Sequence, residues 1–164
     1  MTEEILAEVS ASAPRRWLAV GMMGVLGALL LYIALSTPPA VLGWQLFLIA
    51  FGIIALMLAD KTRRATERVV QLTATGLWDN SGAHIAALEE IERINRGMFA
   101  MKPSNGFTLV LKQPRARAWQ PGLWWAMGKR VGIGGVTPGS QTKFMAQMLE
   151  AMVAERRVQD DQIS

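Results

Sequence analysis

Two apolar runs dominate the hydrophobic pattern of the chain, one at residues 17–36 and one at residues 41–59, and neither contains a charged residue. At a rise of about 1.5 Å per residue, about 20 apolar residues span the hydrocarbon layer of a bilayer. Between the runs, Pro38 and Pro39 remove backbone donors and resist helix continuation. The pattern therefore predicts a transmembrane helical hairpin over residues 17–59 with a very short loop.

Two buried helices of a soluble bundle are the alternative interpretation of these runs. Such helices need a polar face, and neither run has one. Helices that are apolar all round also occur in the core of large proteins, but a chain of 164 residues is too short to build such a core. We therefore expect the hairpin to lie in a membrane.

Positive charge beside the two runs predicts their orientation. The flanking basic residues are Arg15, Arg16, Lys61, Arg63, Arg64 and Arg68, and the loop between the runs has no lysine or arginine. Positively charged flanks stay on the cytoplasmic side of a membrane. Both ends of the chain should therefore be cytoplasmic.

Small residues in the first run predict a helix-packing face. Gly24 and Ala28 form a small-xxx-small pair, and Gly21 and Gly27 lie near the same face. Such a face lets helices approach closely, either within the hairpin or with a partner subunit. The sequence does not distinguish these two uses.

Residues 1–16 form a short cytoplasmic segment before the hairpin. Acidic residues there are spaced around Ile5, Leu6 and Val9. This spacing predicts one or two turns of amphipathic helix, which Pro14 should end.

Residues 60–157 form the predicted cytoplasmic domain, whose hydrophobic pattern is that of an α+β fold. The polar residues 60–68 should extend the second helix into the cytoplasm. Strands are expected at 69–78, 83–91, 98–101, 107–111, 124–125 and 130–133, with turns at 79–82, 95–97 and 103–106 and a polar loop at 114–120. The AALEEIERI part of the second strand fits a helical turn equally well.

A C-terminal helix is predicted to close the domain. Thr137 and Pro138 are typical of a helix start, and apolar residues then recur at steps of three and four from Phe144 to Val153. Residues 158–164 should be a frayed, flexible tail.

Five stretches of the domain carry a family resemblance. They are LTATGLWDNSG, HIAALEEIERI, the strand FTLVL, and KRVGIGG leading into the helix TKFMAQMLEAM, and they cover residues 69–153. Their order resembles the pleckstrin-homology-like domains of small bacterial inner-membrane proteins. The resemblance implies a bent antiparallel sheet or partial barrel, capped by a C-terminal helix and carried just after one or two membrane spans. It also implies a multi-pass protein of the bacterial inner membrane.

The residue types needed for several kinds of chemistry are missing. The chain has no cysteine and a single histidine, His84, which excludes thiolate chemistry and metal sites built on several His or Cys ligands. The stretch 122–130 has the wrong spacing for a phosphate-binding loop, and 132–137 lacks the third glycine of a dinucleotide fingerprint. We therefore predict no cofactor and no metal, and we do not expect an enzyme.

Two weaker candidates for chemistry have ordinary explanations. His84 could serve as a general base, but no Ser or Asp constellation can be argued around it. Glu89, Glu90 and Glu92 could hold a divalent cation only if a loop folded them together. We interpret the first as a surface histidine beside a turn and the others as a solvated acidic cluster.

A basic segment that contains tryptophans is the feature of the domain that points to binding. Residues 93–149 hold nine basic residues and no acidic one. Anionic lipid attracts each nearby Lys or Arg by about 1 kcal/mol, and tryptophan favours the membrane interface. The candidate lipid- or partner-binding residues are Arg115, Arg117, Trp119, Trp124, Trp125, Lys129 and Arg130. In the alternative interpretation the charge is ordinary for a cytoplasmic domain and the tryptophans fill the core.

The neighbouring tryptophans Trp124 and Trp125 allow a more specific prediction. Adjacent side chains of a strand point to opposite faces of the sheet. Only one of the two should therefore face the core, unless a bulge intervenes.

These observations predict a non-catalytic integral inner-membrane protein, an accessory or scaffold subunit or an assembly factor of a larger membrane protein complex. It would interact through the hairpin and the basic domain. The alternative is a sensor that binds anionic lipid headgroups at the membrane surface. Membrane lipids and a membrane protein complex are the expected partners. Nucleic acid is not expected, because the charge density is modest and no recognised reading motif is present.

Overall fold

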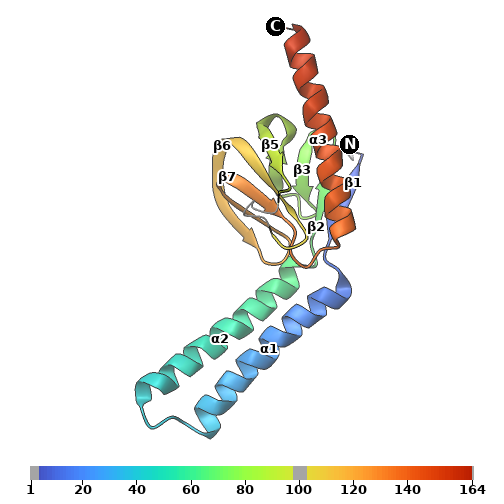
Figure 1. The fold of residues 1–164 in the computed structure, drawn as a ribbon. Helices are drawn as coiled ribbons and strands as arrows, with labels where there is room; N and C mark the ends of the chain where they lie inside the picture. Colours follow the sequence, from blue (N-terminus) through green and yellow to red (C-terminus); the bar gives the residue numbers. More distant parts are fainter. Residues whose placement is uncertain (1–3, 98–102, 164) are drawn as a thin grey trace.

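The computed structural model describes residues 4–97 and 103–163 and has two parts, a helical hairpin and a domain of two sheets beside one long helix (Figure 1). The elements in chain order are β1 (Ala7–Ser10), α1 (Ala13–Ser36), α2 (Leu42–Ala65), β2 (Val69–Leu72), β3 (Gly76–Asp79), β4 (His84–Ala87), the 3₁₀ turn η1 (Leu88–Glu90), β5 (Ile91–Asn95), β6 (Phe107–Gln120), β7 (Trp124–Ile133) and α3 (Gly139–Ile163). All strand pairs are antiparallel, in the orders β1-β2-β3-β4 and β5-β6-β7. The α+β architecture predicted from the sequence is confirmed at this level.

Helices α1 and α2 are each 24 residues long, and both are long and apolar enough to cross a membrane. Helix α2 continues to Ala65, as its polar extension predicted. Helix α1 begins at Ala13, so Pro14 lies in its first turn, where a missing backbone N–H breaks no helical hydrogen bond. The prediction that Pro14 ends a helix was therefore wrong.

The two helices pack closely where glycines face each other. Gly27 of α1 is buried against Gly52 and Leu56 of α2, and a Cβ on Gly27 would lie 2.8 Å from the Leu56 Cγ atom. At the far end of the hairpin, Gln45 Nε2 donates to the Ala34 carbonyl oxygen over 3.0 Å. The small residues therefore let the two backbones approach each other along the hairpin.

The N-terminal segment forms a strand, so the predicted amphipathic helix around Leu6 and Val9 was wrong. Val9 is fully buried opposite Val70 of β2, while Glu8 points outward and accepts a hydrogen bond from Gln71. This inside-outside alternation is that of a half-buried strand. The pairing partner lies about 60 residues away in sequence, which is why local spacing did not reveal it.

Because β1 precedes the hairpin and β2 follows it, the hairpin is inserted between two paired strands of one sheet (Figure 1). The chain thus enters and leaves the hairpin at the same end of the domain (Figure 1). Two further contacts fix this junction. Ser12 N–H donates to the Val136 carbonyl oxygen over 2.9 Å, and Arg15 donates to that of Thr137 over 2.9 Å.

The strands of the first sheet are shorter and more numerous than the sequence predicted. The predicted strand 69–78 is two strands, β2 and β3, joined by a turn that ends at Gly76. Gly76 has φ +151°, and a Cβ there would lie 2.3 Å from the Ala86 carbonyl oxygen. The predicted strand 83–91 becomes β4, η1 and the start of β5, whereas the turn at 79–82 is confirmed.

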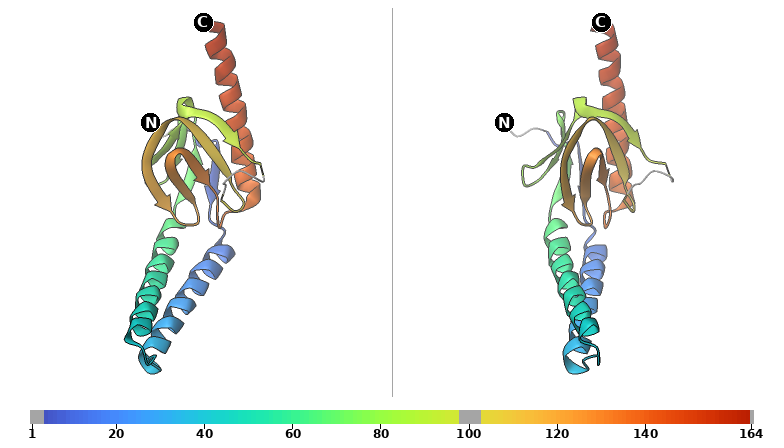
Figure 2. Two further views of the ribbon diagram at one scale, coloured as in Figure 1. Left: turned by 60° about the vertical axis from the view of Figure 1, so that its left-hand side comes forward. Right: turned by 90° about the vertical axis from the view of Figure 1, so that its left-hand side faces the viewer.

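Strands β6 and β7 form two nested arches whose open ends face the helical hairpin (Figure 2). The Gly134 N–H donates to the Leu123 carbonyl oxygen over 2.8 Å, which brings the two ends of β7 together. The predicted polar loop 114–120 was wrong, because β6 continues through it in register with β7. The strand predicted at 98–101 lies outside the described residues.

The core lies between the two sheets and α3. Its largest fully buried side chains are Val9, Val70, Leu72, Leu77, Ile85, Phe107, Leu109, Leu111, Leu123, Ile133, Met145 and Leu149. The predicted stripe of α3 is confirmed except for Phe144, which is 53% exposed. Helix α3 also continues to Ile163, so the tail expected from Val158 onward is helical.

Candidate interaction surface on the β6–β7 ribbon

Four side chains share one face of the β6–β7 ribbon, in the half of the ribbon that adjoins the turn at 121–123. Trp119 is paired directly with Trp125, and the alternation of side chains places Arg117 and Met127 on the same face. Trp119 is 51% exposed and Met127 is 48% exposed. Arg117 donates to the Met127 Sδ atom over 3.5 Å. We call these four residues the tryptophan face.

One member of the tryptophan face, Trp119, contacts the last turns of α2. The Lys61 Nζ atom is 4.6 Å from the centroid of the Trp119 ring, a cation–π distance. The turn between β6 and β7 touches the same helix end, since a Cβ on Gly122 would lie 3.1 Å from the Thr66 Cγ2 atom. Lys61 therefore ties the ribbon to the helical hairpin.

An open hollow of about 500 Å³ lies on this face between the two strands. It is lined by Arg117, Ala118, Trp119, Trp125, Ala126 and Met127. Trp125 is half-buried because its indole lies across Gly132, where a Cβ would come within 2.3 Å of the indole Nε1 atom. The hollow is thus framed by large apolar side chains with one cation at its rim.

Trp124 faces the other way, as the alternation of the strand predicted. It is 5% exposed and belongs to the core with Ala126. Of the two interpretations of the tryptophans, core filling applies to Trp124, whereas Trp119 is exposed on the surface.

Arg115 does not share the tryptophan face but links the two sheets. Its guanidinium donates to the Ile85 carbonyl oxygen, to the His84 carbonyl oxygen over 3.3 Å, and to the His84 Nδ1 atom over 3.2 Å. It also lies 3.5 Å from the Glu90 carboxylate. Since four contacts with β4 and η1 engage this cation, its main role is within the fold.

The contact with Arg115 sets the state of the His84 ring. Arginine only donates hydrogen bonds, so the His84 Nδ1 atom must accept and carries no proton. Burial and then the positive charge of Arg115 lower the pKa of His84 below 6.5, and the Glu90 carboxylate partly offsets them. His84 is therefore a neutral part of the link between the sheets.

Lys129 and Arg130 are exposed beyond the irregularity at Gly128, which has φ +59°. Arg115 is paired with Gly128 near the middle of both strands, and the register shifts on either side of Arg115. The seven predicted residues therefore do not form one surface. Only Arg117, Trp119 and Trp125 share one face, and of these three Trp119 contacts α2 through Lys61.

Arg68, predicted as one of the charges that orient the hairpin, also forms an ion pair with the first sheet. It donates over 2.9 Å to the buried Asp79 carboxylate at the turn after β3. Burial alone would raise the pKa of Asp79, but hydrogen bonds from Ser81 and Arg68 together hold it below its usual value. This ion pair connects the chain after α2 to the β3–β4 turn.

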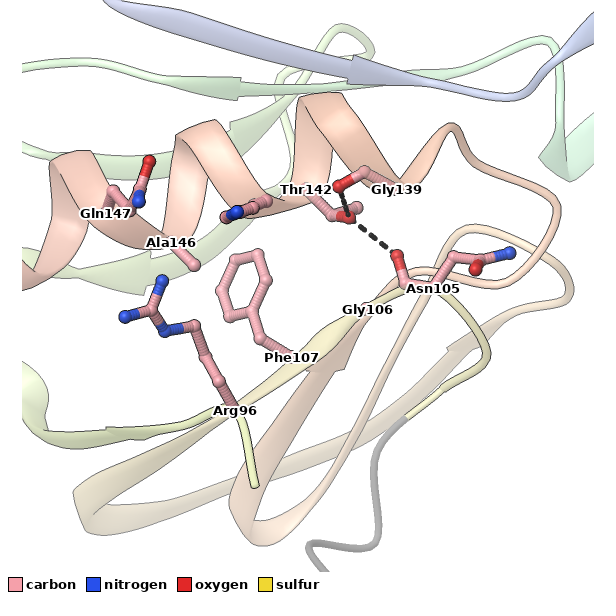
Figure 3. A pocket seen from close by; sticks show the side chains of 9 residues that line it. Arg96, Asn105, Gly106, Phe107, Gly139, Thr142, Ala146 and Gln147 are labelled. Carbon is pink, nitrogen blue, oxygen red and sulfur yellow. Dashed lines mark hydrogen bonds between the residues drawn. The ribbon is translucent and has the colours of Figure 1, made fainter. Parts of the chain in front are cut away.

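A second hollow, of about 560 Å³, lies between β5, the start of β6 and α3 (Figure 3). Polar groups that line this hollow make contacts within the domain. The Thr142 Oγ1 atom lies 2.6 Å from the Asn105 carbonyl oxygen, and Arg96 forms an ion pair with Glu150 over 2.8 Å. Within residues 4–97 and 103–163, no group of three or more acidic or His side chains is placed to hold a metal ion.

The structure also separates the four predicted helix-packing residues. Gly27 is part of the contact between α1 and α2, whereas a Cβ on Gly21 or Gly24 would meet no atom within 4 Å. Ala28 is exposed. Gly21, Gly24 and Ala28 therefore leave an open strip on α1, which we call the outer strip.

Sequence reasoning missed Lys61 and Met127 as members of the surface. In the sequence, Lys61 indicates only the topology of the hairpin, and Met127 carries no local signal of binding. The pairing of Trp119 with Trp125 would have placed Met127 on the same face, but a loop at 114–120 is incompatible with that pairing.

A scan of protein-family models and searches of curated proteins and of solved structures each find no match to this chain.

Proposed function

We propose that the protein is a non-catalytic, membrane-anchored scaffold, an accessory subunit or assembly factor of a larger membrane protein complex. The observation that carries this proposal is the insertion of α1 and α2 between the paired strands β1 and β2. A domain joined by one linker could tumble on its membrane anchor. Here two paired strands and the Arg15 contact with Thr137 join the domain to its anchor, which suits a protein that presents a surface at a fixed height.

The finer assignment of the domain also belongs to this proposal. Two antiparallel sheets of four and three strands, with a C-terminal helix packed against them, support a pleckstrin-homology-like domain. Antiparallel neighbours such as β1 and β2 need only a two-residue turn between them. In this protein the helical hairpin occupies that position. We propose the bacterial inner membrane as its location, with both termini on the cytoplasmic side.

The outer strip supports contact with a partner inside the membrane. Gly21, Gly24 and Ala28 are open on α1, while the contact between α1 and α2 uses Gly27 and Gly52. Close approach of helices at small residues is a common way to associate in a membrane. A partner helix could therefore bind α1 without disturbing the hairpin itself.

The test is a pull-down of the full chain in mild detergent, with the co-purified proteins identified by mass spectrometry. We expect a stoichiometric, salt-resistant membrane complex with the natural chain, and its loss with Gly24→Leu, which fills the outer strip. Met22→Leu, at an exposed position of α1 outside the outer strip, is the control and should retain the complex. Recovery of the natural chain alone would contradict the scaffold proposal.

A second candidate function, recognition of anionic lipid headgroups, is favoured by the position of Trp119 and Lys61 at the end of α2. A lipid sensor would be recovered alone in the same pull-down, with anionic lipid bound. Its lipid binding would also weaken in salt, because exposed charges are screened. The two functions therefore predict different results in one experiment.

A further inference from the structure

We propose that the tryptophan face rests in the interfacial layer of the membrane leaflet at which α2 ends. The occupant of this face is thus the phospholipid surface itself, and the contact fixes how the domain sits above it. The inference rests on the proposal that α1 and α2 span a membrane. It adds a second point of membrane contact, far from the helices in sequence.

The position of the face relative to α2 supports this inference. The apolar run ends at Ala59, and the Lys61 Cα atom lies about 3 Å further along the helix axis. The headgroup layer on each side of a bilayer is about 5 to 7 Å thick. Lys61 therefore lies in that layer, and the ring of Trp119 is 4.6 Å from its Nζ atom.

The composition of the face matches the chemistry of the interface. Tryptophan is enriched at headgroup level because its ring is amphipathic, and Trp119 exposes half of its surface there. Arg117 adds a cation at the rim, which anionic headgroups attract. The hollow between Trp119, Trp125 and Met127 offers apolar walls to the glycerol and upper acyl region of a lipid.

A second aromatic residue marks the same level on the other helix. Trp17 stands near the start of α1, is exposed, and has the Arg16 guanidinium 5.3 Å from its ring. The start of α1 and the end of α2 both adjoin the domain (Figure 1). Two tryptophans paired with cations therefore lie at one end of the hairpin, which is the arrangement of an interfacial belt.

The test uses the absence of cysteine, because a single introduced cysteine is the only labelling site in the chain. The full-length Met127→Cys variant carries an environment-sensitive fluorophore. It is reconstituted in vesicles of zwitterionic lipid to which anionic lipid is added, because anionic lipid attracts juxtamembrane cations. A nitroxide quencher is attached to the lipid headgroups. Gln113→Cys, exposed in the middle of β6, is the distant control, and Ile53→Cys, exposed in the middle of α2, reports insertion of the hairpin by acyl-chain quenching.

We expect a blue-shifted, quenched signal at position 127, no quenching at position 113, and acyl-chain quenching at position 53. Adding Arg117→Glu should remove the quenching at 127, whereas Lys129→Glu, the same charge change beyond Gly128, should leave it. An unquenched position 127 with a quenched position 53 would overturn the inference and leave the face to a protein partner. An unquenched position 53 would overturn the membrane-spanning proposal on which the inference rests.

Discussion

At the scale of single residues, one polar contact joins the two sheets and carries a titrating group. His84 accepts from Arg115 through Nδ1, so protonation of the ring opposes this hydrogen bond. Burial and the charge of Arg115 lower the pKa of His84, which means that the unfolded chain takes up the proton at a higher pH than the folded chain. The stabilising effect of the neutral ring is therefore complete above about pH 6.5 and is lost as the pH falls below that value.

This pH dependence can be measured by unfolding the purified protein in detergent between about pH 7.5 and pH 5. We expect stability to decline toward the acidic end in the natural chain. His84→Asn keeps an acceptor near the Nδ1 position but does not titrate, so its decline should be smaller. Asp79, whose pKa is also lowered, loses its contribution only below about pH 4 and does not interfere. Equal declines in the two proteins would refute the role of His84.

At the scale of elements, β1 distinguishes this fold from a domain that simply follows its anchor. Val9 is fully buried opposite Val70, and α3 is attached to the same strand, since the Ser10 N–H donates to Gln141 Oε1 over 3.1 Å. Strand β1 thus contributes Ala7 and Val9 to the core of the domain. Changes there should affect the stability of the whole domain.

Val9→Asp tests this role of β1. It places a carboxyl group in the core and removes a buried valine, so we expect it to lower the free energy of unfolding by about 3 kcal/mol or more. Glu8→Gln, on the exposed side of the same strand, should change it by less than about 0.5 kcal/mol. Denaturant titration of both variants in detergent gives the comparison. If both substitutions changed the free energy of unfolding by equally small amounts, the result would contradict the buried position of Val9 in β1 and favour a surface helix over residues 5–9.

The contrast between predicted and observed elements has a physical cause. The runs at 17–36 and 41–59, the turn at 79–82 and the stripe of α3 are local patterns, and the sequence predicts them well. Strand β1 and the second half of β6 depend on partners distant in sequence, and their local spacing is ambiguous. Only the register of β6 on β7 shows which residues share a face.

For the candidate site as well, the sequence predicts the local features but not the contacts between distant residues. Composition identified the basic segment and its tryptophans, but Arg115 and Trp124 have partners that only the fold supplies. The contact of Lys61 with Trp119 joins residues 58 positions apart, so no local pattern could indicate it. A charge or an aromatic ring in the sequence does not reveal whether its partner is the protein or the surroundings.

At the scale of the whole molecule, the domain lies at one end of the helical hairpin, which we propose spans a membrane (Figure 1). The rigid junction has a consequence for topology, because residues on either side of the hairpin belong to one sheet. For a hairpin that spans the membrane, as proposed, we therefore expect the loop at 37–40 on the opposite side of the membrane from the domain.

Labelling of single cysteines in intact cells with a membrane-impermeant maleimide tests this central claim most directly. Ala40→Cys lies in the hairpin loop, and Ala154→Cys lies on the exposed side of α3. We predict that position 40 is labelled in intact cells and that position 154 is labelled only after the cells are broken. Labelling of both positions only after breakage, with the protein released from the membrane fraction by alkaline carbonate, would contradict the account.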